Sequence, residues 1–148
     1  MAEVSATIAG LEALKGRVSE ATRQSVADAL HLFQASGMGH APVGVSGNST
    51  NAPGDLRRSI LVDGPVPVSE GTWTGEVGPT TVYGRQRELG GPIFPKSASM
   101  LRFTKFRTVY YRTAVYQHPE PYMLPAYHEV LPSLPAVVDG NIAAVLGG

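Results

Sequence analysis

The stretch "LEALKGRVSEATRQSVADALHLFQASG", Leu11 to Gly37, decides the fold class of this 148-residue chain. Apolar residues recur in it mostly at steps of three and four, at Leu11, Leu14, Val18, Ala21, Val26, Leu30 and Phe33. Charged and polar residues largely fill the positions between them. This spacing predicts one amphipathic helix of about seven turns that ends near Gly37. The residues expected to pack this helix on a sheet are Leu14, Val18, Leu30 and Phe33.

The segments on either side of this helix have a different pattern. Before it, Val4 to Ile8 alternate, and Gly10 marks the change of period. After it, residues 37–54 carry five glycines and two prolines without a strong period, which predicts a long loop. A compact domain seldom keeps so long a connection unless the loop has a task or is disordered. A brief helical turn capped by Asp55 is expected to follow, through Ser59.

Two pairs of strands are predicted downstream of the loop. Ile60 to Val68 and Thr72 to Val77 have the period of strands, and the turn residues Ser69 to Gly71 lie between them, which indicates an antiparallel hairpin. Strand signals resume at Met100 to Phe106 and Val109 to Tyr116, which are rich in Phe, Tyr, Val and Thr.

Shorter helices are predicted around the second pair of strands. Tyr83 to Leu89 form two helical turns that end at a glycine pair. Pro125 opens a helix that Pro132 interrupts after Leu131, and a last helix covers Ala136 to Leu146. Strands grouped between helices, without regular alternation, favour the α+β class. We therefore predict a single domain over residues 1–148, with a long N-terminal helix packed on an antiparallel sheet of about four strands and a short C-terminal helix.

The composition limits the possible function classes. Twelve Lys and Arg balance twelve Asp and Glu, so no overall basic field indicates nucleic-acid binding. The absence of cysteine excludes a disulfide scaffold and a Cys-based zinc site. No basic leader followed by an apolar block opens the chain, and no segment is expected to reach the ~18 to 20 apolar residues of a membrane span. The expectation is a soluble protein without a membrane partner, made in a cytoplasm.

No residue pattern indicates catalysis, a cofactor or a metal. The histidines lack the spacing of metal ligands; they are His31, His40, His118 and His128. Ser46 lies outside a nucleophile-elbow pattern, and the glycine-rich stretches lack the lysine or third glycine of a phosphate-binding loop. We therefore predict that the chain is not an enzyme and needs no cofactor.

Glu88 has three possible roles. As a general base it lacks a second titratable group at a useful position. The other two roles are an ion pair or helix cap within the subunit, and a contact between subunits.

A basic set follows in the second strand pair: Lys96, Arg102, Lys105, Arg107 and Arg112. It is interleaved with Phe103, Phe106, Tyr110 and Tyr111. The mixture fits a surface that binds nucleic-acid backbone and stacks on bases, and it equally fits the solvated face of two strands. The zero net charge favours the second interpretation.

Three segments, in order, resemble one protein family. "APV" at Ala41 to Val43 with "GDLRRSI" at Gly54 to Ile60 resembles its opening signature, Ala-Pro-Val followed by Gly-x-Leu-Arg-x-Ser-Ile. "VYGRQRELGG", Val82 to Gly91, resembles its Tyr-Ala-x-x-x-Glu-x-Gly element, and "PEPYMLPAYHE", Pro119 to Glu129, resembles its Pro-Phe-Leu-x-Pro-Ala helix start. The family is that of the neck or tail-component proteins of long-tailed bacteriophages, typified by the tenth gene product of phage Hong Kong 97.

The chain departs from this family at three places. About ten extra residues, Gly44 to Pro53, separate the two parts of the opening signature. Gly84 stands where alanine is usual, and Pro132 breaks a terminal helix that the family normally continues.

The resemblance implies a virion structural protein at the head-to-tail junction, a tail terminator, tail-completion protein or neck ring that joins the tail tube to the head connector. The implied assembly is a homo-oligomeric ring, expected to be a hexamer, that contacts neighbouring connector and tail-tube proteins while DNA passes through its lumen without specific binding. The long loop would then be an arm that reaches a neighbour. The alternatives are a head-closure (stopper) protein, a small nucleic-acid-binding module, and a hydrolase that uses Glu88 or His128.

The ring implies a set of contact residues. Those expected at subunit or ring contacts are Val43, Asn48, Asn51, Arg57, Arg58, Tyr83, Arg85, Glu88, Arg107, Arg112 and Glu129. Arg102, Arg107 and Arg112 are expected to pair with carboxylates of a neighbouring subunit, because a planar guanidinium suits such pairs. Glu88 and Glu129 are the candidate carboxylates.

Overall fold

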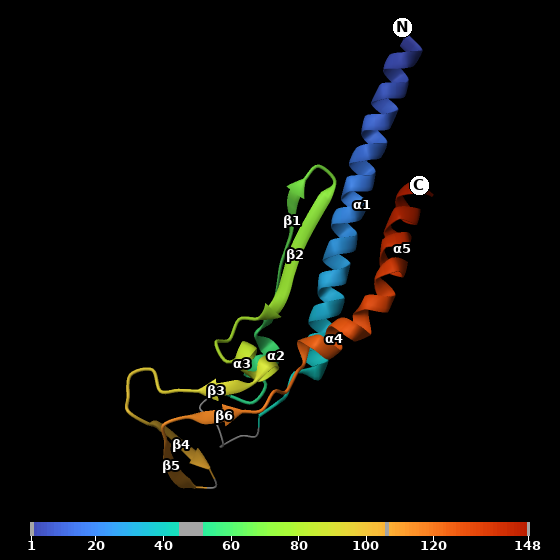
Figure 1. Cartoon of the computed structure of the whole chain (residues 1–148). Coiled ribbons are helices and arrows are strands. Elements are labelled where there is room, and N and C mark those ends of the chain that lie inside the picture. The colour runs from blue at the N-terminus through green and yellow to red at the C-terminus, as the bar shows by residue number, and fades with distance from the viewer. Residues whose placement is uncertain (1, 45–51, 106, 148) are drawn as a thin grey trace.

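The computed structural model describes residues 2–44, 52–105 and 107–147. One long helix, α1 (Ala2–His40), is the longest element that the structure describes (Figure 1). The helix predicted from Leu11 to Gly37 is confirmed, but it extends further at both ends. Two predictions about the ends of this helix were wrong. Val4 to Ile8, which were set apart because they alternate, belong to the helix, and so do residues 37–40, which were assigned to the loop. The helix ends just before Pro42, whose ring disfavours helical backbone at the residue that precedes it.

The predicted first hairpin is confirmed. Strands β1 (Ile60–Ser69) and β2 (Thr72–Pro79) pair antiparallel, with Ile60 opposite Pro79. The hairpin lies along α1 (Figure 1). At Gly75 a Cβ atom would lie 2.4 Å from Leu30 Cδ1, so glycine at this position lets β2 approach the helix.

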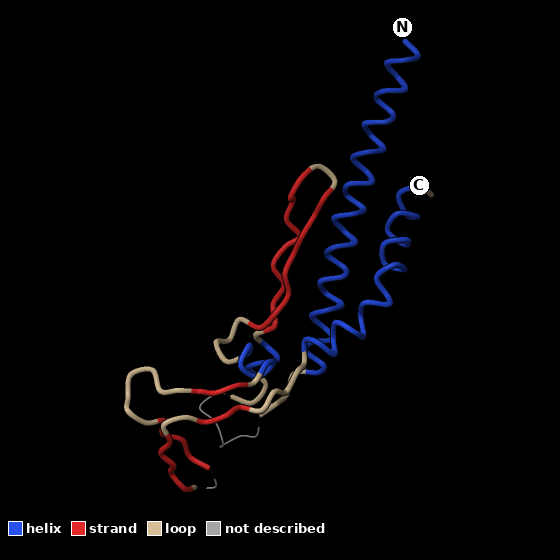
Figure 2. The backbone as a smooth tube through the Cα atoms, in the orientation of Figure 1, coloured by secondary structure: helices blue, strands red, loops and turns tan. Residues whose placement is uncertain are grey.

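The remaining strands form two further ribbons in place of one sheet of about four strands. Strand β3 (Gly91–Ile93) pairs with β6 (Val115–Gln117), and β4 (Leu101–Lys105) pairs with β5 (Thr108–Arg112). Each of the three sheets in the described chain has two strands (Figure 2). The run predicted as one strand from Val109 to Tyr116 is thus divided, because its second part pairs with β3.

The short helices lie close to their predicted positions. They are α2 (Asp55–Arg58), α3 (Gly84–Leu89), α4 (Met123–Val130), the 3-10 turn η1 (Leu131–Ser133) and α5 (Leu134–Leu146). Two details differ from the prediction. Pro132 converts the end of α4 into a 3-10 turn that leads directly into α5. The cap residue of α2 is Gly54, at φ 82°, while the Asp55 carboxylate accepts a hydrogen bond from the Ala52 N–H at 2.7 Å.

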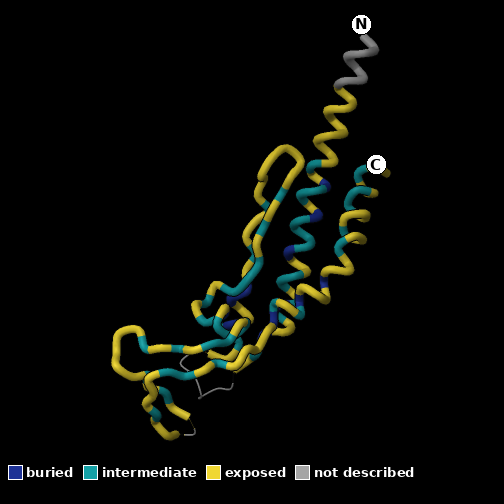
Figure 3. The backbone as a smooth tube through the Cα atoms, viewed as in Figure 1, coloured by how far each residue is buried: buried dark blue, intermediate teal, exposed yellow. Residues whose placement is uncertain are grey.

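The core is small and lies where α1 ends. Its buried residues are Ala41, Leu56, Ile60 and Tyr122, with Met38, Val77, Tyr83 and Met123 packed around them. Among the residues predicted to hold α1 on a sheet, Leu30 is buried, but Leu14 and Val18 are 39% and 36% exposed, so that prediction was wrong for these two. The hairpin covers only part of α1, and the N-terminal turns of the helix extend beyond it (Figure 3). Phe33 stacks on Tyr127 of α4, with ring centroids 5.9 Å apart.

Helices α4 and α5 also pack on α1. In Figure 1, α5 and the β1–β2 hairpin lie on opposite sides of this helix, and the β4–β5 ribbon forms the far end of the molecule. This elongated arrangement leaves many large apolar side chains in contact with solvent; examples are Leu11, Leu61, Val68, Leu124 and Leu146.

Candidate functional site

Glu88 connects the two helices that flank the core. It lies near the end of α3, and its carboxylate accepts hydrogen bonds from the N–H groups of Tyr122 at 2.7 Å, Met123 at 3.0 Å and Leu124 at 3.0 Å. The first N–H groups of a helix have no partner within the helix, and a negative charge is favoured there by the helix dipole. Glu88 therefore caps α4 from another element, which confirms the cap role among the roles open from the sequence.

Further bonds fix the same junction. The Tyr122 hydroxyl donates to the Gly84 carbonyl at 3.1 Å, and burial raises the pKa of Tyr122 to about 12. Arg87 pairs with Glu120 at 2.8 Å. Gly84 has no room for a side chain, because a Cβ atom would lie 2.6 Å from the Pro79 side chain. Glycine at this position therefore lets α3 pack closely on the end of β2.

A second polar junction joins α1 to the C-terminal helices. The Glu129 carboxylate accepts a hydrogen bond from the Ser36 hydroxyl and contacts His40 Nε2 at 2.9 Å, and both contacts lower the pKa of Glu129. Asn141 of α5 donates to Asp28 at 2.9 Å. Glu129 thus has partners within its own subunit, as Glu88 does.

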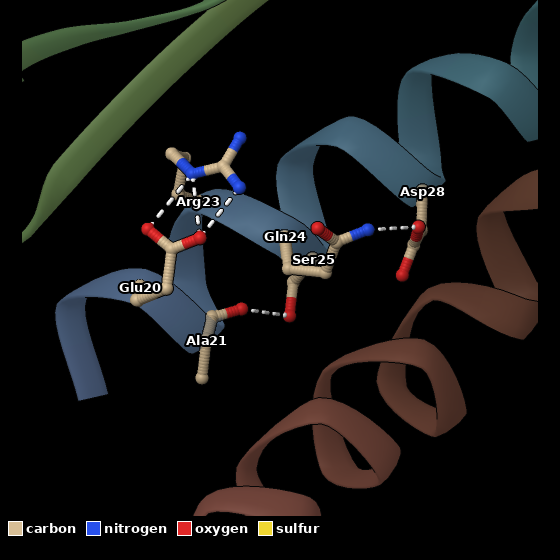
Figure 4. Close-up of polar contacts among 6 residues, drawn as sticks. All are labelled: Glu20, Ala21, Arg23, Gln24, Ser25 and Asp28. Carbon is tan, nitrogen blue, oxygen red and sulfur yellow. Dashed lines mark hydrogen bonds and ion pairs between the residues drawn. The ribbon is translucent and has the colours of Figure 1, made fainter. Parts of the chain in front are cut away.

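The surface of α1 itself carries local polar contacts (Figure 4). Arg23 pairs with Glu20, Gln24 donates to Asp28 at 2.8 Å, and the Ser25 hydroxyl donates to the Ala21 carbonyl at 2.8 Å. In these bonds the polar side chains of α1 contact other residues of α1, and the six residues drawn form no catalytic arrangement.

The β4–β5 ribbon, together with Arg107 at its tip, forms a surface that we call the basic arm. Arg102, Arg107 and Arg112 are exposed, and none of them makes an ion pair with a described residue. Arg107 has φ 64°, a left-handed conformation that suits a tight hairpin turn. Phe103 and Tyr110 stack across the strands with centroids 5.6 Å apart.

The residues predicted as contacts fall into separate places. Arg57 and Arg58 lie on α2, Arg85 lies on α3, and Tyr83 packs against the core. Val43 is 50% exposed in the segment that follows α1. Arg107 and Arg112 lie on the basic arm, and Glu129 lies at the junction of α1 and α4. Asn48 and Asn51 lie outside the described residues, as does the middle of the predicted arm loop.

One acidic pair was missed by the sequence interpretation. Asp63 of β1 lies directly opposite Glu76 of β2, and both side chains are exposed. The alternation of the two predicted strands was a usable signal, because it places both residues on the face opposite to Val62 and Val77. Like charges directly opposite each other destabilise an antiparallel pair.

The C-terminal helices correct a further expectation. The helical segment Met123–Leu146 has 24 residues and is long and apolar enough, by length and composition alone, to cross a membrane. It also contains Glu129 and Asp139, and it packs on α1.

Within the described chain, no group of three His, Asp or Glu side chains is placed to hold a metal ion.

The total surface is large for the size of the chain. The accessible area is 10248 Å² for 15.6 kDa. A compact monomer of this mass exposes about 7,200 Å², so the chain exposes about 3,000 Å² more than such a monomer. An excess of this size is comparable to the area that obligate interfaces bury.

Comparison of the chain with protein-family models, with curated proteins and with solved structures finds no match.

Proposed function

We propose that the chain is a structural subunit of the head-to-tail junction of a long-tailed bacteriophage: a tail terminator, tail-completion protein or neck ring that joins the tail tube to the head connector. It is made in the cytoplasm of the host bacterium and acts in the virion. The proposal rests on the resemblance in three sequence segments, and one structural observation supports it most.

That observation is the convergence of the three segments on one small core. Ala41, Leu56 and Ile60 of the first segment pack with Tyr122 of the third. Glu88 of the second segment caps the helix that the third segment begins. Residues from segments that are far apart in sequence thus depend on one another. Such mutual dependence is what a shared structural unit requires.

The exposed area supports an assembly role. A subunit with about 3,000 Å² more surface than a compact monomer can bury a large interface on each of two sides. Two different patches that meet between neighbours form heterologous contacts, which generate a ring when the rotation closes. The predicted hexameric ring, with DNA passing through its lumen, remains part of the proposal.

An apolar groove between α1 and α5 is a further place for a neighbour. It is lined by Thr22, Ser25, Val26, Ala29, Leu134, Val137 and Val138. These residues include five aliphatic side chains, which fits contact with another protein surface better than contact with DNA.

The test is to delete the gene in a phage that encodes the chain and to examine the lysate by electron microscopy. We expect separate heads and tails that join when the purified chain is added. Tails of abnormal length would indicate a terminator, whereas heads that lose DNA would indicate the stopper alternative. A reconstruction of the virion neck that lacks this chain would refute the proposal.

A nucleic-acid-binding module is the second candidate, because the basic arm combines arginines with aromatic rings. It predicts binding to duplex DNA of unrelated sequences that weakens steeply as salt is raised. Fluorescence anisotropy with the purified chain distinguishes the two candidates.

A further inference from the structure

The charge of the chain is divided between its two ends. Residues 89–119, which include the basic arm, contain five Lys and Arg and no Asp or Glu. The rest of the chain therefore holds seven basic and twelve acidic residues, a formal charge of −5 against +5. The net charge of the whole chain is zero, but its positive and negative charges are therefore concentrated in different parts of the chain.

One face of the basic arm consists of exposed side chains. The strand register pairs Arg102 with Tyr111 and Thr104 with Val109. All of these side chains are exposed, and Tyr111 is 56% exposed. Arg107 is exposed at the tip of the same ribbon. The face and the tip together thus carry two guanidinium groups, an aromatic ring and an aliphatic side chain.

The outer face of the β1–β2 hairpin has the complementary composition. Its centre is the Asp63–Glu76 pair, and neither carboxylate has a hydrogen bond or ion pair with a described residue. Leu61, 52% exposed, and Val66, 49% exposed, lie beside the pair. Two opposed carboxylates repel each other, and a guanidinium placed between them would relieve that repulsion. The face is therefore incomplete in the isolated subunit.

The two faces lie apart within one chain. In Figure 1 the β4–β5 ribbon is at the far end of the molecule, beyond β3 and β6, whereas the β1–β2 hairpin lies along α1. The carboxylates first expected to receive the arginines are also already used, because Glu88 caps α4 and Glu129 contacts Ser36 and His40. A partner for the arm must come from a second molecule that carries unpaired carboxylates.

We propose that the basic arm of one copy docks face to face on the outer face of the β1–β2 hairpin of the next copy. Arg102 and Arg107 then lie beside Asp63 and Glu76, and the aromatic and aliphatic side chains of the arm cover the apolar residues of the hairpin. The contact joins two different patches, so it repeats from copy to copy and forms a ring when the rotation between copies closes. This inference rests on the proposed function, because it specifies the contact that would build the ring.

The first experiment is disulfide trapping, which is direct because the chain has no cysteine. Thr74→Cys lies on the outer hairpin face, and Thr104→Cys lies on the exposed arm face. Because threonine is uncharged, both variants keep every charge of the chain. Two full-length preparations, one with a size tag, are mixed at low salt and oxidised. We expect a mixed dimer from this pair, and no more than background from Asp139→Cys with Thr104→Cys. Equal yields from the two pairs overturn the proposal.

The second experiment is charge reversal followed by sedimentation velocity. Asp63→Lys with Glu76→Lys should weaken self-association about tenfold, because several exposed charge pairs act together. Adding Arg102→Glu and Arg107→Glu to the same chain should restore it. Self-association that the first double reversal leaves unchanged overturns the proposal.

A neutral variant separates docking from folding. Asp63→Asn with Glu76→Gln removes the repulsion within the hairpin, so the melting temperature of the subunit should stay equal or rise while self-association weakens.

DNA binding is the alternative role of the arm. If Arg102→Glu with Arg107→Glu abolishes DNA binding but leaves self-association intact, the arm binds nucleic acid and the proposal is overturned.

The two proposals fail in different ways. A chain found in the virion neck without trapping between Thr74→Cys and Thr104→Cys refutes the arm contact alone. Trapping by a chain that is absent from virions refutes the proposed function alone.

Discussion

Replacement of Glu88 by alanine removes one acceptor from three backbone N–H groups at the start of α4. Loss of a helix cap costs about 0.5–2 kcal/mol, and loss of a negative charge at a helix N-terminus costs about 0.3–1 kcal/mol. The Tyr122 N–H belongs to a residue that is fully buried, and a buried donor left without a partner adds about 1–3 kcal/mol. Because these terms overlap, we expect Glu88→Ala to lower the free energy of unfolding by about 2–4 kcal/mol.

Thermal unfolding followed by circular dichroism measures this effect. For a chain of this size, the expected loss corresponds to a fall in melting temperature of roughly 6–16 °C. Glu88→Gln keeps an acceptor and should lose less. The matched control is Glu120→Gln, which breaks only the exposed pair with Arg87 and should change stability by about 0–1 kcal/mol. If Glu88→Ala has the same melting temperature as the control, the Glu88 carboxylate does not stabilise α4.

Three further predictions concern other contacts. Spectrophotometric titration should find Tyr122 ionising near pH 12 instead of near its usual pKa of 10, and because the folded pKa is raised by burial, its contribution to stability should be complete below pH 10 and lost as pH rises toward 12. The hydrogen bond from Asn141 lowers the pKa of Asp28, so Asn141→Ala should raise that pKa toward the ordinary value of an aspartate in an NMR titration, and the stability lost on acidification should shrink. Phe33 is only half-buried and stacks on Tyr127, so Phe33→Ala should cost about 2 kcal/mol in urea unfolding, less than the roughly 3–5 kcal/mol of a fully buried phenylalanine.

Element positions were largely predictable because they depend on local spacing. The period of α1, the first hairpin and the α3 segment follow from the residues within each element, and all three were confirmed. The boundary errors have local causes as well. Val4 to Ile8 alternate, but helical residues surround them and no proline interrupts the chain before Pro42, so the helix continues through them.

The candidate site was less predictable, because its contacts join distant segments. Glu88 stands between Arg87 and a glycine pair in the sequence, yet its three donors lie more than thirty residues later in the chain. The sequence interpretation did not identify Asp63 or Glu76 as candidate site residues. Only their register in the hairpin shows that they lie opposite each other and lack a partner.

By itself, the sequence determined the α+β class, the long helix, the first hairpin and the division of charge between residues 89–119 and the rest, since periodicity and composition are properties of short windows. The tertiary structure decided which surfaces remain open. Leu14 and Val18 have the helical period of core residues, but other segments cover them only in part, so they stay 39% and 36% exposed. Burial depends on what other segments lie against a face, and the spacing of residues within one helix carries no information about that.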